Sequence, residues 1–350
     1  MKIFFRADAN KNIGQGHVMR CLSVADAFAA KGADCSFICA KDSYTETIEQ
    51  RGYPVVRLEN AYDEMDKELS VLIKILGKEN PDYLFVDSYY VTREYLNSLT
   101  NVVHSVYLDD VYAFAYPVKT LINYNVYASE EQYKALYERE GCVLPKMLLK
   151  PLYAPLRKEF GDIIHKEPAE KVKNVLVSFG GADPLRMAMQ FVNKLKERKD
   201  LTENFSFHMI LGAMEPDLKE LKKTADETKW LTVSVNVRNM KEVLLSSDIA
   251  ISAAGSTQYE ICACRIPGIN FSMADNQLPG GEEFGRLGIY RYVGDVRTVE
   301  NFYDKLADAV KELAENYELR CDMIRKEAEL VDGKGAERIA EYFCRHVFET

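Results

Sequence analysis

Short apolar runs that alternate with longer segments of helical periodicity are the strongest constraint on the fold of this sequence. The runs are rich in β-branched and aromatic residues and are bounded by turn residues. This order is typical of βαβ units, whose strands pair in a mostly parallel sheet. The pattern is present twice along the chain. The first set of runs is KIFFRAD, DCSFICA, YPVVRLE, DYLFVDS, VVHSVYLDD and TLINYNV, and the second is NVLVSFGG, FSFHMILG, LTVSVNV, DIAISAAG, PGINFS and YRYVGDV.

The boundary between the two sets lies in the segment PLYAPLRKEFGDIIHKEPAEKVK, residues 151–173. Its prolines bracket an irregular stretch, and a charged segment follows. A chain of 350 residues is long enough to form two domains. We therefore predict an α/β fold with two Rossmann-like domains facing a central cleft, residues 1–160 and residues 161–330. After residue 300 the sequence indicates consecutive helices and no further strand.

Composition argues against several classes of function. The formal net charge is −9, with 54 acidic and 45 basic residues, and backbone phosphates of nucleic acids bind clusters of Lys and Arg instead. No apolar run approaches the roughly 18 to 20 residues of a membrane-spanning helix, so no membrane insertion is expected. The eight cysteines are scattered without a CxxC motif, which favours free thiols in a reducing compartment. We expect a cytoplasmic protein that needs no obligate protein partner.

The first functional motif follows the first predicted strand, where ligands bind in open parallel sheets. There IGQGHVMRC places Gly14 and Gly16 around a glutamine, with His17 at the expected start of a helix. Met19 occupies the third glycine position of a dinucleotide fingerprint, so the glycines more plausibly let the backbone bend and approach a ligand. The helix dipole disfavours an imidazolium at His17, which predicts a neutral ring able to accept a proton. A histidine that only caps the helix is an equally open interpretation.

Acidic and aromatic residues end two further strands of the first set. VDSYY carries Asp87 and Tyr89, and LDD carries Asp109 and Asp110. These carboxylates can cap a helix, fix a loop or, together with Asp8, assist His17, and the sequence does not choose among these roles. No cluster of His, Asp, Cys or Glu has the spacing of metal ligands, so no metal is predicted.

Two turns in the second set have the features of a phosphate site. In VSFGGADP, Gly180 and Gly181 form a turn after a strand, with Asp183 as the expected helix cap and Pro184 as the first helical residue. Such a turn exposes backbone N–H groups to an anion. The second turn, ISAAGSTQYE, also carries an acidic residue.

In ISAAGSTQYE the residues Gly255, Ser256 and Thr257 follow a strand, and Glu260 stands about one turn into the helix. Hydroxyl and N–H groups suit a phosphate, and an acidic group one turn later suits a ribose diol. A capping box, in which a hydroxyl and a later glutamate satisfy the helix start, explains the same spacing equally well. A further loop, SMADNQLPGG, places Asn276 and Gln277 at the same predicted edge.

Taken together, RADAN…IGQGHVMRC, SFGGADP, SAAGSTQYE and ADNQ resemble the UDP-2,4-diacetamido-2,4,6-trideoxy-β-L-altropyranose hydrolases of pseudaminic acid biosynthesis. That family is similar in fold to the GT-B glycosyltransferases. The resemblance implies hydrolysis without metal or cofactor, in which water attacks the anomeric carbon, UDP leaves and the configuration inverts. It also implies that residues 331–350 form a C-terminal helix that packs toward the N-terminal domain. Pro155, in PLYAPLRKEF, departs from the aliphatic residue expected after YA.

The resemblance implies roles for individual residues. His17 matches the catalytic base, and Tyr89 and Asn276 match positions that line the sugar site. By likeness to the related UDP-GlcNAc transferase of peptidoglycan synthesis, Glu260 would hold the ribose and the backbone of Val237 the uracil. The expected substrate-binding set is Gly14, Gly16, Arg20, Tyr89, Asn276 and Gln277, and the expected UDP-binding set is Gly180, Gly181, Val237, Gly255, Ser256, Thr257 and Glu260.

Other functions on the same fold stay open at this point. A glycosyltransferase would use a hydroxyl group of an acceptor in place of water, and fold alone does not separate the two reactions. A UDP-sugar-binding protein without activity and a hydrolysing 2-epimerase are further alternatives. The expected partner in each case is a UDP-sugar.

Overall fold

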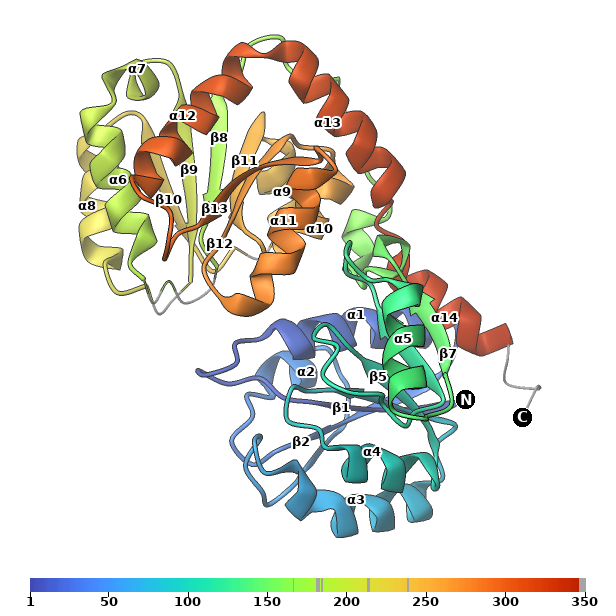
Figure 1. The fold of residues 1–350 in the computed structure, drawn as a ribbon. Coiled ribbons are helices and arrows are strands. Elements are labelled where there is room, and N and C mark those ends of the chain that lie inside the picture. Colours follow the sequence, from blue (N-terminus) through green and yellow to red (C-terminus); the bar gives the residue numbers. More distant parts are fainter. Residues whose placement is uncertain (166, 181–182, 184, 213–214, 238, 346–350) are drawn as a thin grey trace. The chain divides into compact units, whose positions relative to one another are not determined.

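The computed structural model describes residues 1–165, 167–180, 183, 185–212, 215–237 and 239–345. The chain divides into two compact units. Unit 1 consists of Met1–Lys158 and Gly333–Thr350, and unit 2 consists of Glu159–Asp332. Each unit contains a parallel sheet with helices on its faces (Figure 1). This arrangement confirms the predicted two-domain α/β fold class.

The sheet of unit 1 is entirely parallel, in the order β3-β2-β1-β4-β5-β6-β7. Its first six strands coincide with the first set of apolar runs. The seventh was not predicted, because it is a four-residue edge strand with a lysine at its first position. The strands are β1 (Lys2–Ala7), β2 (Asp34–Cys39), β3 (Val55–Arg57), β4 (Tyr83–Asp87), β5 (His104–Leu108), β6 (Thr120–Asn123) and β7 (Lys146–Leu149), and the helices are α1 (Gly16–Ala29), α2 (Glu46–Gln50), α3 (Met65–Glu79), α4 (Arg93–Thr100), α5 (Glu130–Arg139) and α14 (Gly335–Arg345), with the short 3₁₀ helices η1 (Pro151–Tyr153) and η2 (Lys158–Phe160), the latter crossing into unit 2.

Helices α1 and α14 cover one face of this sheet, and α3 and α4 cover the other (Figure 1). The alternation of side chains along a strand explains why β1 serves both cores. Ile3 and Phe5 pack in the cluster with α1 and α14, whereas Phe4 packs in the cluster with α3 and α4. Both faces of β1 are therefore buried, which fits its almost continuous apolar run.

Helix α14 joins unit 1 from the far end of the sequence. Its Phe343 lies within 5.1 Å of the Phe85 ring centroid and 4.9 Å of that of Tyr83, which are residues of the central strand β4. The start of the helix is equally close-packed, because a Cβ added at Gly335 would lie 2.1 Å from the carbonyl oxygen of Ala154. Only glycine fits at this position without a backbone shift.

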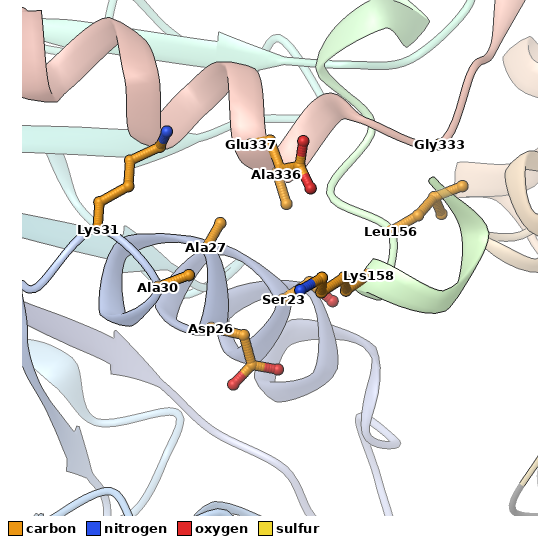
Figure 2. Close-up of a pocket in the computed structure, with 10 residues that line it drawn as sticks. All are labelled: Ser23, Asp26, Ala27, Ala30, Lys31, Leu156, Lys158, Gly333, Ala336 and Glu337. Atoms are coloured by element: carbon orange, nitrogen blue, oxygen red, sulfur yellow. The ribbon is translucent and has the colours of Figure 1, made fainter. Parts of the chain in front are cut away.

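A small cavity of about 170 Å³ lies between α1 and α14 (Figure 2). Its walls include Ser23, Ala27 and Ala30 of α1 and Ala336 of α14. Ala27 and Ala336 point toward one another in Figure 2. The cavity follows from these short side chains, which leave space between the helices that larger residues would fill.

The sheet of unit 2 is also parallel, in the order β10-β9-β8-β11-β12-β13. Its strands coincide with the second set of apolar runs, and α12 and α13 follow without a further strand, as predicted. The strands are β8 (Asn174–Ser178), β9 (Ser206–Leu211), β10 (Leu231–Val235), β11 (Ile249–Ala253), β12 (Gly268–Ser272) and β13 (Tyr290–Asp295), and the helices are α6 (Met187–Glu197), α7 (Lys199–Thr202), α8 (Leu218–Glu227), α9 (Met240–Leu245), α10 (Thr257–Cys264), α11 (Leu278–Arg286), α12 (Phe302–Glu315) and α13 (Tyr317–Leu330), with the 3₁₀ helix η3 (Asp275–Gln277).

The cysteines are free thiols, and most of them are buried. Burial raises the pKa of Cys35, Cys39 and Cys264 to about 12, so these thiols stay protonated at neutral pH. Among the described residues, no helix is both long enough and apolar enough to span a membrane.

Candidate functional site

His17 lies at the point in unit 1 where the strand order reverses. Strand β1 is flanked by β2 on one side and by β4 on the other. The chain connects β1 to β2 on one side and β4 to β5 on the other, so the connections from β1 and β4 run in opposite directions. The crevice at the carboxyl ends of two such strands is the usual ligand site of open α/β sheets. The loop after β1 leads to His17 in the first turn of α1, and Asp87 ends β4. The two residues are therefore neighbours although 70 positions separate them.

The central contact of this site joins the His17 ring to the Asp87 carboxylate. Nδ1 of His17 lies 2.6 Å from Oδ1 of Asp87. Burial alone would raise the pKa of Asp87, but the positive charge of Arg20 and the contact with His17 hold it well below its usual range. An ionised carboxylate only accepts hydrogen bonds, so Nδ1 carries the hydrogen. The lone pair of the ring is then on Nε2, which makes no hydrogen bond to any described residue.

Arg20, one helical turn after His17, holds Asp87 in place. Its Nε and Nη2 donate to the two carboxylate oxygens of Asp87 at 2.5 Å each. Its Nη1 donates to Asp110 and to the hydroxyl of Tyr124, both at 3.1 Å. Nη2 also lies 3.1 Å from Nδ1 of His17. Because both nitrogens carry hydrogen, this approach is a contact and not a hydrogen bond.

The hydrogen bonds of Arg20 bear on its expected role in substrate binding. Nearly all of its N–H groups point to protein acceptors, and its side chain is only 11% exposed. The geometry favours Arg20 as the residue that orients Asp87. Tyr124 was not among the expected site residues. The only signal for it is its position directly after a predicted strand, in TLINYNV.

Tyr89 covers the His17 ring from the loop after β4. The two rings meet edge to face, with centroids 4.7 Å apart and an interplanar angle of 77°. The Tyr89 hydroxyl donates to Asp110 at 3.0 Å, so Asp110 links Tyr89 to Arg20. The Tyr89 side chain is nevertheless 42% exposed. It can therefore contact a ligand while it restrains the His17 ring.

The remaining two carboxylates that could have assisted His17 have other partners. Asp8 accepts hydrogen bonds from Arg6 at 2.5 Å and from the backbone N–H of Ala40 at 2.7 Å. Asp109 accepts from the backbone N–H of Val111 at 3.0 Å and from the hydroxyl of Tyr116 at 2.8 Å. Both residues fix loops. Of the candidate carboxylates, Asp87 is the one that contacts His17 directly.

The two glycines before His17, Gly14 and Gly16, differ in backbone conformation. Gly14 has a φ of +71°, a conformation that favours glycine. Gly16 has an ordinary φ, and no atom lies within 4 Å of a Cβ added there. The structure therefore has room for a side chain at Gly16. The N-cap of α1 is Gln15, so the capping role left open for His17 is not observed.

A second hollow lies in unit 2, again where the strand order reverses, between β8 and β11. It has a volume of about 340 Å³, within the range of small-molecule sites. Three segments line it. They contribute Ser178, Phe179, Gly180 and Asp183 after β8, Ala253, Gly255, Ser256 and Thr257 after β11, and Met273 and Gln277 after β12.

The start of α10 presents open hydrogen-bond donors to this hollow. Ser256 is the N-cap of the helix, but its side chain makes no capping hydrogen bond. The capping box that the sequence left open is therefore not formed by Ser256. The backbone N–H and hydroxyl groups of Ser256 and Thr257 donate to no other described residue. No atom lies within 4 Å of a Cβ added at Gly255, and its φ is ordinary.

The turn after β8 differs from its prediction. Helix α6 begins at Met187. Pro184, the expected first helical residue, and Gly181 lie outside the described residues. The N-cap of α6 is Arg186 and not Asp183. The Asp183 carboxylate nevertheless accepts from the first N–H groups of the helix, those of Met187 at 2.9 Å and Ala188 at 2.7 Å. These donors are therefore not available to a phosphate. An anion in this hollow would be bound by α10 and not by α6.

Of the other expected ligand residues of unit 2, Gln277 lines this hollow, and Asn276, Val237 and Glu260 do not. Gln277 lines it and accepts from the N–H of Met273 through Oε1 at 3.0 Å. Asn276 is exposed on η3 and is not among the lining residues. Val237 follows β10 at the edge of the sheet, and Glu260 lies further along α10. Neither of them lines the hollow.

Sequence comparison finds similar proteins at low identity. No family model matches the sequence. The chain is 22% identical over 277 residues to an uncharacterised protein of Methanocaldococcus jannaschii, a match that covers 76% of this chain and about half (54%) of that protein. It is 26% identical over 264 residues to the UDP-2,4-diacetamido-2,4,6-trideoxy-β-L-altropyranose hydrolase of Campylobacter jejuni, which covers 74% of this chain and 87% of that enzyme.

A third match is a Helicobacter pylori protein named as both a pseudaminic acid cytidylyltransferase and a hydrolase of the same altropyranose. It is 27% identical over 134 residues, which is 38% of this chain and 23% of that protein. The match therefore concerns a minor part of a longer protein.

Solved structures of similar fold cover the whole chain. Acinetobacter baumannii MurG superposes with a TM-score of 0.70 at 12% identity, over 98% of this chain and 99% of that one. A putative UDP-N-acetylglucosamine 2-epimerase from Listeria monocytogenes gives a TM-score of 0.68 at 12% identity, over 100% and 97%. At such identities the likeness concerns the fold alone. The chain therefore has the two-domain α/β architecture known as the GT-B fold.

Proposed function

We propose that this protein is an enzyme that acts on a UDP-sugar and hydrolyses it. The observation that carries the proposal is the His17–Asp87 contact of 2.6 Å, which leaves Nε2 of His17 as a proton acceptor at the ligand edge of unit 1. Further support comes from the names of the relatives and structural neighbours, which are UDP-sugar hydrolases and epimerases among others. The proposed substrate is a UDP-linked 2,4-diacetamido-2,4,6-trideoxyhexose, by similarity to the Campylobacter enzyme.

In the proposed reaction, Nε2 of His17 takes a proton from a water molecule whose oxygen attacks the anomeric carbon. The bond between that carbon and the phosphate oxygen breaks, its electron pair leaves with UDP, and the configuration inverts. Asp87 stabilises the imidazolium that forms, and Arg20 keeps Asp87 ionised. A nucleoside diphosphate is a good leaving group at neutral pH, so the reaction needs no strong general acid.

The diphosphate is assigned to the hollow of unit 2. Open N–H and hydroxyl donors of Ser256 and Thr257 and the dipole of α10 suit its negative charge. Gly180 and Gly255 leave room beside it. Glu260 for the ribose, Val237 for the uracil, and Asn276 and Gln277 for the sugar are carried over from the family resemblance as parts of this proposal, as are Gly14, Gly16 and Tyr89 in unit 1.

The test is turnover of the UDP-sugar in ¹⁸O-labelled water, with both products analysed by mass spectrometry. Label in the free sugar and none in UDP is the expected result, since water attacks carbon. Label in UDP would mean attack at phosphorus and would contradict the role of His17. Release of UDP only after addition of an acceptor would identify a glycosyltransferase. Binding of the UDP-sugar without turnover would leave only a binding protein.

A further inference from the structure

Asn10, in the loop between β1 and α1, is a buried residue with one unsatisfied donor. Its side chain is 5% exposed, and its Nδ2 is enclosed without a hydrogen-bond partner among the described residues. Buried polar groups in folded proteins nearly always have partners, so each exception calls for a physical reason. This one lies in the loop that leads to His17.

Every other polar group of Asn10 is in use. Its backbone N–H and carbonyl pair with Gly14 at 3.2 and 2.9 Å. Its Oδ1 accepts from the backbone N–H groups of Asn12 at 2.9 Å and Ile13 at 3.1 Å. These two donors fix the orientation of the amide, because exchanging its oxygen and nitrogen would place donors opposite donors. Nδ2 therefore points away from the turn that Oδ1 stabilises.

The turn itself does not require an amide. Aspartate and serine also accept hydrogen bonds from backbone N–H groups two and three positions later. Aspartate would close this loop with no side-chain donor, and serine would replace the fixed amide N–H groups with a single hydroxyl hydrogen that can rotate toward an acceptor. The Nδ2 group of Asn10 therefore contributes nothing to the turn and stays unpaired in it. This points to a hydrogen-bond partner outside the described contacts.

We propose that Asn10 is a substrate-binding residue whose Nδ2 donates a hydrogen bond to an acceptor oxygen on the sugar part of the substrate. The inference rests on the proposed function, because the group beside His17 in that reaction is the sugar whose anomeric carbon is attacked. Nδ2 is enclosed in this structure, so the loop 11–15 must shift when the sugar binds. Gly14 lies within that loop, and no atom of the protein lies within 4 Å of a Cβ added there.

The experiment compares Asn10→Ser and Asn10→Asp with the wild type. Both variants keep an oxygen for Asn12 and Ile13 and lose the Nδ2 donor. We expect KM for the UDP-sugar to rise about tenfold, since a lost hydrogen bond to substrate has that effect. The dissociation constant of UDP alone, measured by calorimetry, should stay unchanged. The urea midpoint of Asn10→Ser should equal or exceed that of the wild type.

Asn12→Ser is the matched control, because Asn12 is in the same loop and its amide already donates to the hydroxyl of Tyr62 at 3.2 Å. A rise in KM of the same size in Asn12→Ser would attribute the effect to loop distortion and overturn the proposal. An unchanged KM in both Asn10 variants would overturn it as well, as would a lowered urea midpoint with KM unchanged, which is the result for a purely structural amide. A wild type without activity on the UDP-sugar would instead reject the proposed function.

Discussion

At the scale of single residues, the candidate site depends on one carboxylate that three side chains share. Asp87 accepts hydrogen bonds from His17 and Arg20, and the thiol of Cys21 lies 3.7 Å from its Oδ2. Arg20 balances the negative charge of Asp87, so the pair is close to neutral beside the histidine ring. The ring is thereby oriented through Nδ1 and keeps Nε2 for chemistry.

We expect His17→Ala to lower kcat by roughly 10²- to 10⁴-fold, the usual contribution of a general base. Asp87→Asn should lower kcat on a similar scale, because an amide can donate to Nδ1 and stabilise the wrong tautomer. Steady-state kinetics with the UDP-sugar measure both effects, and calorimetry with UDP should show unchanged affinity. Turnover near the wild-type rate in His17→Ala would remove His17 from the mechanism.

The double variant His17→Ala/Asp87→Asn tests whether the two residues act together. If Asp87 acts through His17, the losses in His17→Ala and in the double variant should be nearly equal, since residues that act as a unit are not additive. Independent, multiplied losses would mean that Asp87 has a separate role.

At the scale of elements, the start of α10 and the packing of α13 against α10 make different contributions. The first presents open donors to the hollow of unit 2. The second buries Glu327, whose carboxylate oxygens have no hydrogen-bond partner among the described residues. The start of α10 therefore bears on the proposed ligand binding, and the packing of α13 on stability.

Gly255→Ala tests whether a ligand approaches the turn before α10. The protein has space for the added methyl group, so the variant should unfold at the same temperature as the wild type. If a phosphate occupies this position, the dissociation constant of UDP should rise about tenfold or more. Gly77→Ala is the control, because Gly77 is exposed on α3 with equal space. It should gain about 0.5–1 kcal/mol of stability and bind UDP normally.

Glu327→Met is expected to stabilise the protein at alkaline pH. Burial raises the pKa of Glu327 well above its usual value, and Arg265 opposes this only in part. A pKa that is raised in the folded state gives stability that is complete below the unfolded value of about 4.3 and is lost as pH rises toward the folded value. The free energy of unfolding in urea should therefore fall between pH 5 and pH 8 more steeply in the wild type than in the variant. Equal slopes would mean that Glu327 has a hydrogen-bond donor or a cation beside it.

At the scale of the whole molecule, the sequence predicted most of the fold because strand patterning is local. Within the described residues, twelve of the thirteen strands coincide with apolar runs, and β7 was missed because KMLL is short and lies at a sheet edge. The site was harder to predict. His17 and Tyr89 follow strands and carry local signals, but the partner of His17 is set by the pairing of β1 with β4. No local pattern indicates which of four carboxylates that pairing selects.

The same limit explains the turn after β8. The dipeptide Asp183-Pro184 indicates a helix start, but α6 begins later, at Met187. The carboxylate of Asp183 reaches forward to cap that start, which removes donors that the sequence had assigned to phosphate. Which backbone N–H groups a carboxylate can reach depends on the path of the loop, and the spacing of residues in the sequence does not define that path.

Phe343→Ala tests how far unit 1 depends on the end of the chain. Phe343 is 1% exposed and packs against Phe28, Tyr83 and Phe85. Truncation of such a side chain costs about 3–5 kcal/mol, so the urea midpoint of unit 1 should fall clearly. Fluorescence of Trp230 reports on unit 2 and should show an unchanged midpoint if the units unfold separately. A midpoint of unit 1 equal to that of the wild type would contradict the importance of α14.

The return of α14 to unit 1 has a consequence for biosynthesis. A ribosome completes β1 to β7 before it makes unit 2, and it makes α14 only after unit 2. At about 5–20 residues per second, synthesis of unit 2 takes on the order of 10–30 s. During that interval the aromatic side chains of β4 that Phe343 later covers lack the contact with α14, although Phe28 of α1 already packs on Phe85. Unit 2 is continuous in sequence and meets no such delay, so the second half of this protein can reach its native state before the first.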